Sequence, residues 1–374
     1  MSALTNSLHE RILSEGSLTF YEWMKSALYD PDQGYYCRSD RERWGRQGDY
    51  RTSPERSVLF AATFARYFAR LYHDLGSPAA LTIVEVGAGT GNFAETVLET
   101  LQLRFPGIFS KTHYFIDESS PDSSSRARLR LERFGTQVEV KSLAALNPLE
   151  HAIVFSNELL DAFPVHRVTM QGGELRELHV AVNESGSFEW TVGQLSTPRL
   201  SEYFGRLGIL LGEGQIEDVN LEIETWLELV SSKLRSGYLI TVDYGTEASV
   251  LYNGARRREG SIRAFHKHQI SGDVLLQPGQ QDITSSVDWS FVKMVGASHG
   301  LRVMAFERQD RFLLDAGLLV EMELRAKETP RESERLRAST SAREMILPGG
   351  LAESFQVLVQ NKEHPPDAPY QEEL

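Results

Sequence analysis

The order of apolar and polar positions predicts alternating strands and helices from residue 81 onward. Apolar runs cover 81–86, 112–116, about 138–140 and 152–156, and a helical spacing extends from about Phe93 to Leu103. After an interruption, a helix over about 221–234 stops at Gly237 and is followed by apolar runs at 238–242, 301–306 and 355–359. Strands that alternate with helices of this length form parallel sheets covered on both faces. We therefore predict an α/β fold: a doubly wound, seven-stranded, Rossmann-like sheet.

Two segments depart from this alternation. Residues 1–75 show helical spacing, with one helix opening at 18–24 and another capped by Ser53-Pro54-Glu55, so we predict a helical N-terminal extension. Residues 165–192 instead alternate apolar and polar positions around two glycine turns, which predicts a β-meander. We expect a main domain over 76–374, with a β-rich insertion on the substrate side at about 165–215 and a loop region at 246–295.

The first predicted strand ends in the turn Glu85-Val86-Gly87-Ala88-Gly89-Thr90-Gly91. Such a turn brings bare backbone to a ligand at the carboxyl edge of the sheet. A dinucleotide fingerprint needs glycine where this chain has Asn92, and the Lys-Ser/Thr pair of a phosphate-binding loop is absent. The remaining common ligand is S-adenosylmethionine. We assign Glu85, Gly87, Ala88, Gly89 and Gly91 to its binding, with Glu85 accepting from the ammonium group.

Acidic residues also follow the next strands along the chain. Asp117 and Glu118 end the second strand, where a carboxylate can accept from both ribose hydroxyls. Strand alternation lets one of the two face the cofactor, and we favour Glu118. Asn157 and Glu158 end the fourth strand, and Asp161 follows within one turn. These three residues are our candidates for orienting a methyl acceptor that carries a guanidinium or amino group.

Charge and composition narrow the class of protein. The 374 residues carry a formal charge of −13, a sign that repels phosphate backbones and disfavours general nucleic-acid binding. Cys37 is the single cysteine, so the sequence offers no disulfide framework, and its histidines lack metal-ligand spacing, so we predict no metal site. The first thirty residues lack an apolar signal region and a transit pattern, and no apolar run approaches about eighteen residues. We expect a cytoplasmic protein without membrane insertion.

The chain resembles the MidA-like methyltransferases in blocks that run nearly from end to end. The blocks include Ala27-Leu28-Tyr29-Asp30-Pro31, Gly48-Asp49-Tyr50, the glycine turn, the segment from Asn157 to Val165, Asp243-Tyr244-Gly245 and Val287-Asp288-Trp289. Mitochondrial members of that family act as assembly factors for respiratory complex I and methylate an arginine of one of its subunits. The resemblance implies a class I methyltransferase fold, S-adenosylmethionine as cofactor, and a protein arginine as acceptor. A subunit of a respiratory complex is the partner it suggests.

Further candidates lie outside the strand ends. We predict that Gly48, Asp49 and Thr52 close over the cofactor as a lid. Arg263 and His268 belong to a basic stretch whose second half matches a family block, and Asp282 lies in the next one, so we place all three on the substrate side. Two alternatives to a protein methyltransferase stay open: a cofactor-binding assembly chaperone with little turnover, and a small-molecule methyltransferase. A dehydrogenase is the weakest alternative because of the glycine spacing.

Overall fold

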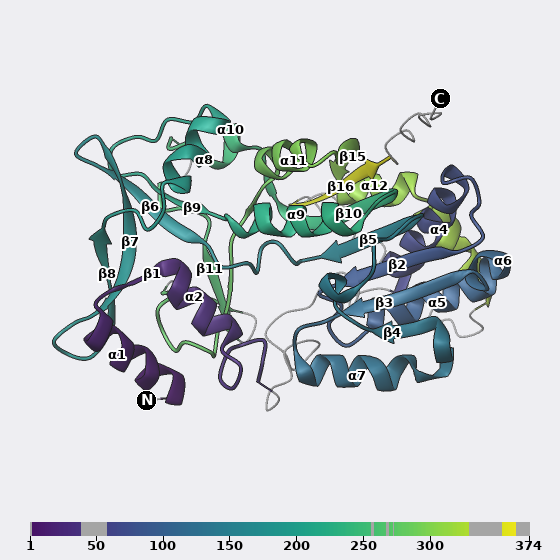
Figure 1. The fold of residues 1–374 in the computed structure, drawn as a ribbon, viewed down its shortest axis with the longest axis horizontal. Helices are drawn as coiled ribbons and strands as arrows, with labels where there is room; N and C mark the ends of the chain where they lie inside the picture. The colour runs from purple at the N-terminus through teal and green to yellow at the C-terminus, as the bar shows by residue number, and fades with distance from the viewer. Residues whose placement is uncertain are drawn as a thin grey trace, which may run out of the picture.

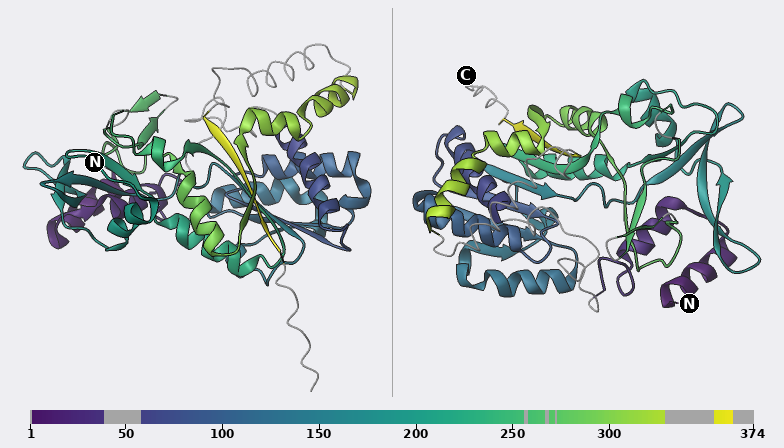
Figure 2. Two further views of the ribbon diagram at one scale, coloured as in Figure 1. Left: turned by 90° about the horizontal axis from the view of Figure 1, so that it is seen from above. Right: turned by 180° about the vertical axis from the view of Figure 1, so that it is seen from behind.

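The computed structural model describes residues 2–38, 58–255, 258–266, 269–271, 273–328 and 354–363. Figure 1 shows a large sheet with helices on both faces at one end of the molecule, and a smaller antiparallel sheet with helices α1 and α2 at the other. Figure 2 shows the same two parts lying side by side in two further views. The carboxyl edge of the large sheet faces the smaller part, so a site at this edge can draw residues from both.

The large sheet has the strand order of a doubly wound fold. Within the described residues its path runs β15 (Arg302–Arg308), β16 (Phe355–Lys362), β10 (Gly237–Thr246), β5 (Ala152–Asn157), β2 (Leu81–Val86), β3 (Thr112–Asp117) and β4 (Val138–Val140). Strands β10, β5, β2, β3 and β4 are parallel, β16 is antiparallel to both neighbours, and β14 (Val287–Asp288) adds a short pairing to β10. The predicted α/β class is confirmed. The strand order reverses between β2 and β5, where such sheets bind ligands.

Helices cover both faces of this sheet. One face packs against α4 (Val58–Asp74), α5 (Asn92–Arg104), α7 (Pro121–Leu131), α12 (Gln309–Asp315) and α13 (Leu318–Glu328), and the other against α8 (Arg199–Leu207), α9 (Glu222–Lys233), α10 (Ala248–Leu251) and α11 (Trp289–Ser298). Short turns α6 (Pro106–Phe109), η1 (Glu132–Gln137) and η2 (Leu143–Ala145) connect these elements. The ring of Phe93 stacks on Phe155 with centroids 4.3 Å apart, which joins α5 to β5. Helix α4, which we assign from the sequence to the N-terminal extension, thus packs directly on the large sheet.

The smaller sheet is antiparallel, as the alternating pattern predicts. It contains β9 (Ile216–Val219), β6 (His166–Gln171), β7 (Glu174–Val182), β8 (Phe188–Gly193) and the two-residue β1 (Leu18–Thr19). Helices α1 (Ala3–Glu15) and α2 (Phe20–Tyr29) bury Leu8, Phe20 and Trp23 against it, together with Val180 of β7. A third sheet joins β12 (Gln269–Ser271), β11 (Arg263–His266) and β13 (Asp282–Thr284). The N-terminal segment is therefore part of the same core as the meander.

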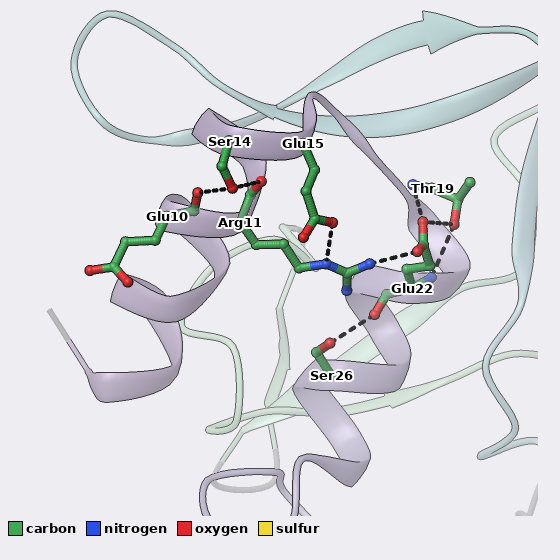
Figure 3. Close-up of polar contacts among 7 residues, drawn as sticks. All are labelled: Glu10, Arg11, Ser14, Glu15, Thr19, Glu22 and Ser26. Atoms are coloured by element: carbon green, nitrogen blue, oxygen red, sulfur yellow. Dashed lines mark hydrogen bonds and ion pairs between the residues drawn. The ribbon is translucent and has the colours of Figure 1, made fainter.

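Helix α2 has a well-defined start, which Figure 3 shows. Thr19 accepts from the Glu22 N–H through its hydroxyl, and the Glu22 carboxylate accepts from the Thr19 N–H, which makes a capping box. Arg11 of α1 donates to Glu22 at 2.7 Å and to Glu15 at 2.9 Å. These contacts fix the direction of α2, and hence the position of Tyr29 at its other end.

None of the helices in the described ranges combines the length and apolar composition needed to span a bilayer. The cap that the sequence predicts at Ser53-Pro54-Glu55 lies outside the described residues.

We expect Thr19→Ala to lower the free energy of unfolding by about 1 kcal/mol, because the first turn of α2 loses its side-chain acceptor. Urea unfolding followed by circular dichroism measures this change. Ser14→Ala is the matched control: the Ser14 hydroxyl donates only to helix carbonyls, so its loss is expected to change the free energy by less than about 0.5 kcal/mol. Equal effects of the two variants would show that the cap does not hold α2.

Candidate active site

The turn after β2 is built from glycines in the left-handed backbone region. Gly87, Gly89 and Gly91 have φ of +71°, +56° and +79°, values that other residues adopt only with strain. A Cβ added to Gly87 would lie 3.1 Å from Leu159 Cδ1, so a side chain there would crowd Leu159. The Gly87 N–H donates to the Asp117 carbonyl at 2.8 Å, which fixes the turn to the next strand. The result is a cradle of bare backbone at the carboxyl edge.

The two acidic residues after β3 have different partners. Glu118 accepts from the Gly89 N–H at 2.8 Å through Oε2 and from the Ser120 N–H at 2.7 Å through Oε1. Asp117 accepts from the Leu143 N–H at 2.7 Å. Glu118 is therefore the carboxylate at the glycine turn, whereas Asp117 is attached to a different turn of the chain.

Glu85 lies beneath the glycine turn and is 4% exposed. Its Oε2 accepts from the hydroxyl of Tyr114 on the neighbouring strand at 2.7 Å. Burial raises the pKa of Glu85 to about 8; the hydrogen bond from Tyr114 opposes this rise, and the nearby charge of Glu118 adds to it. The side chain therefore favours its neutral form unless a positive group approaches.

The segment after β5 carries the predicted acceptor residues in a strained conformation. Glu158 has φ of +52°, which is uncommon for a residue with a side chain, and its N–H donates to the Val242 carbonyl at 2.9 Å. The Asn157 amide donates to Glu158 Oε1 at 3.1 Å. Such strain persists only where the surroundings hold the backbone in place.

Asp243, near the end of β10, provides much of the support for this backbone conformation. Its Oδ2 accepts from the backbone N–H groups of Leu160 at 2.9 Å and Asp161 at 3.3 Å, and its Oδ1 accepts from the Tyr244 N–H at 2.9 Å. The side chain is fully buried. Burial, together with the charges of Asp161 and Glu158, raises the pKa of Asp243 well above its usual range.

Three further elements attach to the carbonyls of the same segment. Asn220, after β9, donates to the Leu160 carbonyl at 2.9 Å. The Ser285 N–H, after β13, donates to the Asp161 carbonyl at 2.9 Å. The Tyr29 hydroxyl of α2 donates to the Ala162 carbonyl at 2.9 Å. We call residues 157–162 the acceptor segment; residues in or directly after strands of all three sheets, together with helix α2, fix its backbone.

Asp161 itself is 4% exposed, and burial raises its pKa to about 6 against an opposing hydrogen bond from Tyr244. Its Oδ1 is buried and has no hydrogen-bond partner within the described part of the chain. A buried acceptor atom without a donor costs free energy, so its retention points to a donor supplied by a ligand. The described residues contain no group of three His, Cys, Asp or Glu side chains arranged to hold a metal ion.

The remaining predicted site residues differ in their burial and in whether the structure describes them. Asp282 on β13 is buried and accepts from the Tyr36 hydroxyl at 2.6 Å, and its charge contributes to the raised pKa of Tyr29 beside the acceptor segment. Arg263 is exposed on β11. His268, Gly48, Asp49 and Thr52 lie outside the described residues.

Sequence reasoning did not assign roles to Tyr29, Tyr244 or Asp243. For Asp243 a signal existed, because a carboxylate directly after a buried strand marks the carboxyl edge of the sheet. Tyr29 offered no such signal: it lies 133 residues from the carbonyl to which it donates.

A doubly wound sheet, a glycine turn after its first strand and an acid after the second define the class I methyltransferases. Residues 63–307 match the model of a family described as S-adenosyl-L-methionine-dependent methyltransferases, and the chain belongs to this family. It is an S-adenosylmethionine-dependent methyltransferase. The predicted cofactor is thereby confirmed.

Relatives and solved structures agree with this membership. The chain is 26% identical to the Drosophila melanogaster "Protein arginine methyltransferase NDUFAF7 homolog, mitochondrial", over 80% of this chain and 71% of the relative. It is 22% identical to the Homo sapiens protein arginine methyltransferase NDUFAF7, over 95% and 82%. A Burkholderia thailandensis protein solved with bound S-adenosyl-homocysteine superposes with a TM-score of 0.86 at 28% identity, over 96% of this chain and 92% of that one.

The expected cytoplasmic location is contradicted by these relatives, because the animal proteins are named as mitochondrial. The expectation rested on the pattern of the first thirty residues. Those residues build α1, β1 and α2, which bury Leu4, Leu8 and Ile12 in the N-terminal core. Their pattern therefore reports packing and carries no information on location.

We expect the pH dependence of stability to change when Glu85 is replaced by Gln. The unfolded chain releases the Glu85 proton near its ordinary pKa of 4.5, whereas the folded chain retains it to about 8. The contribution of the Glu85 proton to the stability of the folded chain is therefore complete below pH 4.5, and it is lost as pH rises toward 8. Relative to Glu85→Gln, the cofactor-free wild type is expected to lose about 1.4 kcal/mol per pH unit in this range, measured by urea unfolding. Glu150→Gln, at an exposed position, is the control; parallel curves for wild type and Glu85→Gln would contradict the assignment.

Proposed function

We propose that this enzyme transfers the methyl group of S-adenosylmethionine to a guanidinium nitrogen of an arginine in a protein substrate. The observation that carries the proposal is Asp161 Oδ1, a buried carboxylate oxygen without a donor, on the segment that follows β5. The segment lies beside the glycine turn, because a Cβ on Gly87 would contact Leu159. The names of the relatives, which are protein arginine methyltransferases, support the same acceptor.

The residues at the glycine turn fit the cofactor. Gly87, Gly89 and Gly91 have positive φ and no side chain, so the turn presents backbone at the edge of the sheet, which suits the flat methionine end. In the proposal, Glu118 exchanges its contact with the Gly89 N–H for the two ribose hydroxyls. Glu85, neutral when the site is empty of positive charge, ionises beside the cofactor ammonium. The cofactor supplies an electrophilic methyl group on a sulfonium.

The acceptor segment supplies the groups that hold and deprotonate the acceptor. Asp161 and Glu158 accept N–H bonds from the guanidinium, and Asn157 orients Glu158 through its amide. As the new N–C bond forms, the S–C bond of the cofactor breaks and S-adenosylhomocysteine leaves. The proton lost by the nitrogen passes to the Asp161 carboxylate, which is ionised above pH about 6. Most of the rate enhancement comes from positioning the nitrogen in line with the methyl group.

A protein substrate with a cationic side chain also fits the overall charge of −13. Within the proposal, a subunit of a respiratory complex is the candidate that the family resemblance suggests. A small-molecule methyltransferase and a cofactor-binding chaperone are the alternatives that the following experiment separates.

We expect the wild type, incubated with methyl-labelled cofactor and lysate of the source organism, to label arginine in a protein, as identified by mass spectrometry. Asp161→Asn is expected to lower transfer about 100-fold, because it removes the proton acceptor, while cofactor affinity changes less than about twofold. Glu118→Gln is the matched acid-to-amide control and is expected to weaken cofactor binding at least about tenfold, with much smaller loss of transfer at saturating cofactor.

Label confined to small molecules would contradict the protein substrate. Bound cofactor without any transfer would favour the chaperone. If Asp161→Asn and Glu118→Gln weakened cofactor binding equally, the separation into cofactor and acceptor carboxylates would be wrong.

A further inference from the structure

Tyr29, at the end of α2, lies between the carboxylate at the glycine turn, Glu118, and two carboxylates on the acceptor side, Asp161 and Asp282. Its hydroxyl donates to the Ala162 carbonyl, one residue beyond Asp161. Burial raises the pKa of Tyr29 well above its usual range, and the charges of Asp161, Asp282 and Glu118 raise it further. The residue therefore lies within electrostatic reach of the carboxylate at the glycine turn and of two carboxylates on the acceptor side.

A second tyrosine accompanies it from the same part of the chain. The rings of Tyr29 and Tyr36 lie 5.4 Å apart at an angle of 38°. The Tyr36 hydroxyl donates to Asp282 at 2.6 Å. The backbone returns to α2 between the two residues, since the Tyr36 N–H donates to the Leu28 carbonyl at 2.9 Å. Both hydroxyls are thus bound to elements of the acceptor side, and both rings are held beside carboxylates.

We propose that α2 and the turn after it provide an aromatic wall of the acceptor site, and that Tyr29 is a specificity-determining residue for a cationic, planar acceptor group. This inference rests on the proposed function and extends it to the N-terminal segment. The geometry that supports it is the combination of a partly buried ring, a hydroxyl bound to the acceptor segment, and the unpaired Asp161 Oδ1 one residue away.

The physical reason lies in how carboxylates and aromatic rings select cations. Carboxylates alone attract an ammonium or a guanidinium without preference for shape. An aromatic face attracts a cation through its quadrupole, and it stacks on the planar guanidinium better than on the compact ammonium. A wall of two rings beside two carboxylates therefore distinguishes a guanidinium from its neutral isostere and from an ammonium.

The test uses two tripeptide amides as probes, acetyl-Gly-Arg-Gly and acetyl-Gly-citrulline-Gly, titrated into the protein saturated with S-adenosylhomocysteine. The variants are Tyr29→Leu, which removes the ring, and Tyr29→Phe, which removes only the hydroxyl. Tyr21→Leu and Tyr21→Phe are matched controls on the same helix, because the Tyr21 hydroxyl also donates to a distant residue, Glu222, at 2.7 Å. Affinities for S-adenosylhomocysteine and S-adenosylmethionine verify that each variant is folded.

We expect Tyr29→Leu to reduce the preference for arginine over citrulline about tenfold, the range of a partly desolvated cation–π contact. Tyr29→Phe is expected to retain most of it, and the Tyr21 variants all of it. In the lysate assay, Tyr29→Leu raises the apparent KM for lysate protein, with a smaller change in maximal rate and cofactor affinities within about twofold of wild type.

An unchanged preference in Tyr29→Leu would overturn the inference. So would a selective loss of affinity for S-adenosylmethionine relative to S-adenosylhomocysteine, because the ring would then recognise the sulfonium of the cofactor. Failure of the proposed function is a separate result: the wild type then labels no arginine. If the wild type labels arginine and Tyr29→Leu does so with unchanged apparent KM, only the inference fails.

Discussion

The carboxylate of Asp243 makes the interactions on which the candidate site depends most. It is fully buried at the end of β10, and it accepts from three backbone N–H groups, two of them in the acceptor segment. These bonds hold the segment in a conformation that includes a left-handed Glu158. Without the bonds, the strain at Glu158 would favour a different backbone path, and Asp161 would not be presented at the edge of the sheet.

The same segment connects the N-terminal helices to the candidate site. Tyr29 on α2 donates to the Ala162 carbonyl, and α2 is fixed in turn by its cap at Thr19 and by the smaller sheet. The acceptor side is therefore assembled from parts that are distant in the sequence. The Tyr29 hydrogen bond connects the docking of α2 directly to the acceptor segment.

Burial of carboxylates at the glycine turn and at the acceptor segment gives the candidate site its electrostatic character. Desolvation raises the pKa values of Glu85, Asp161 and Asp243, because burial penalises the ionised form. A cation that enters the site offsets this cost, since it favours the charged form of its neighbours. The proposed function uses this property for the ammonium and sulfonium of the cofactor and for the guanidinium of the acceptor.

The sequence was sufficient for the elements that repeat a simple period. The buried runs at 81–86 and 152–156 predicted β2 and β5, and the alternating glycines predicted the turn between β2 and α5. The strand order could not be predicted, because it depends on pairings between distant segments. The position of Tyr29 depends on such a contact, and so does the role of Asp243, which acts on backbone groups 82 and 83 residues away. The choice of Glu118 over Asp117 for the ribose remains a prediction, although Glu118 is the one at the glycine turn.

The most direct measurement is a crystal structure of the protein with S-adenosylhomocysteine and the acetyl-Gly-Arg-Gly amide bound together. We expect a guanidinium nitrogen within about 3 Å of Asp161 Oδ1, beside Tyr29, and on the side of the sheet edge that faces the sulfur of the cofactor product. A peptide bound at another face, with Asp161 Oδ1 still buried and without a donor, would contradict the assignment of residues 157–162 as the segment that holds the methyl acceptor.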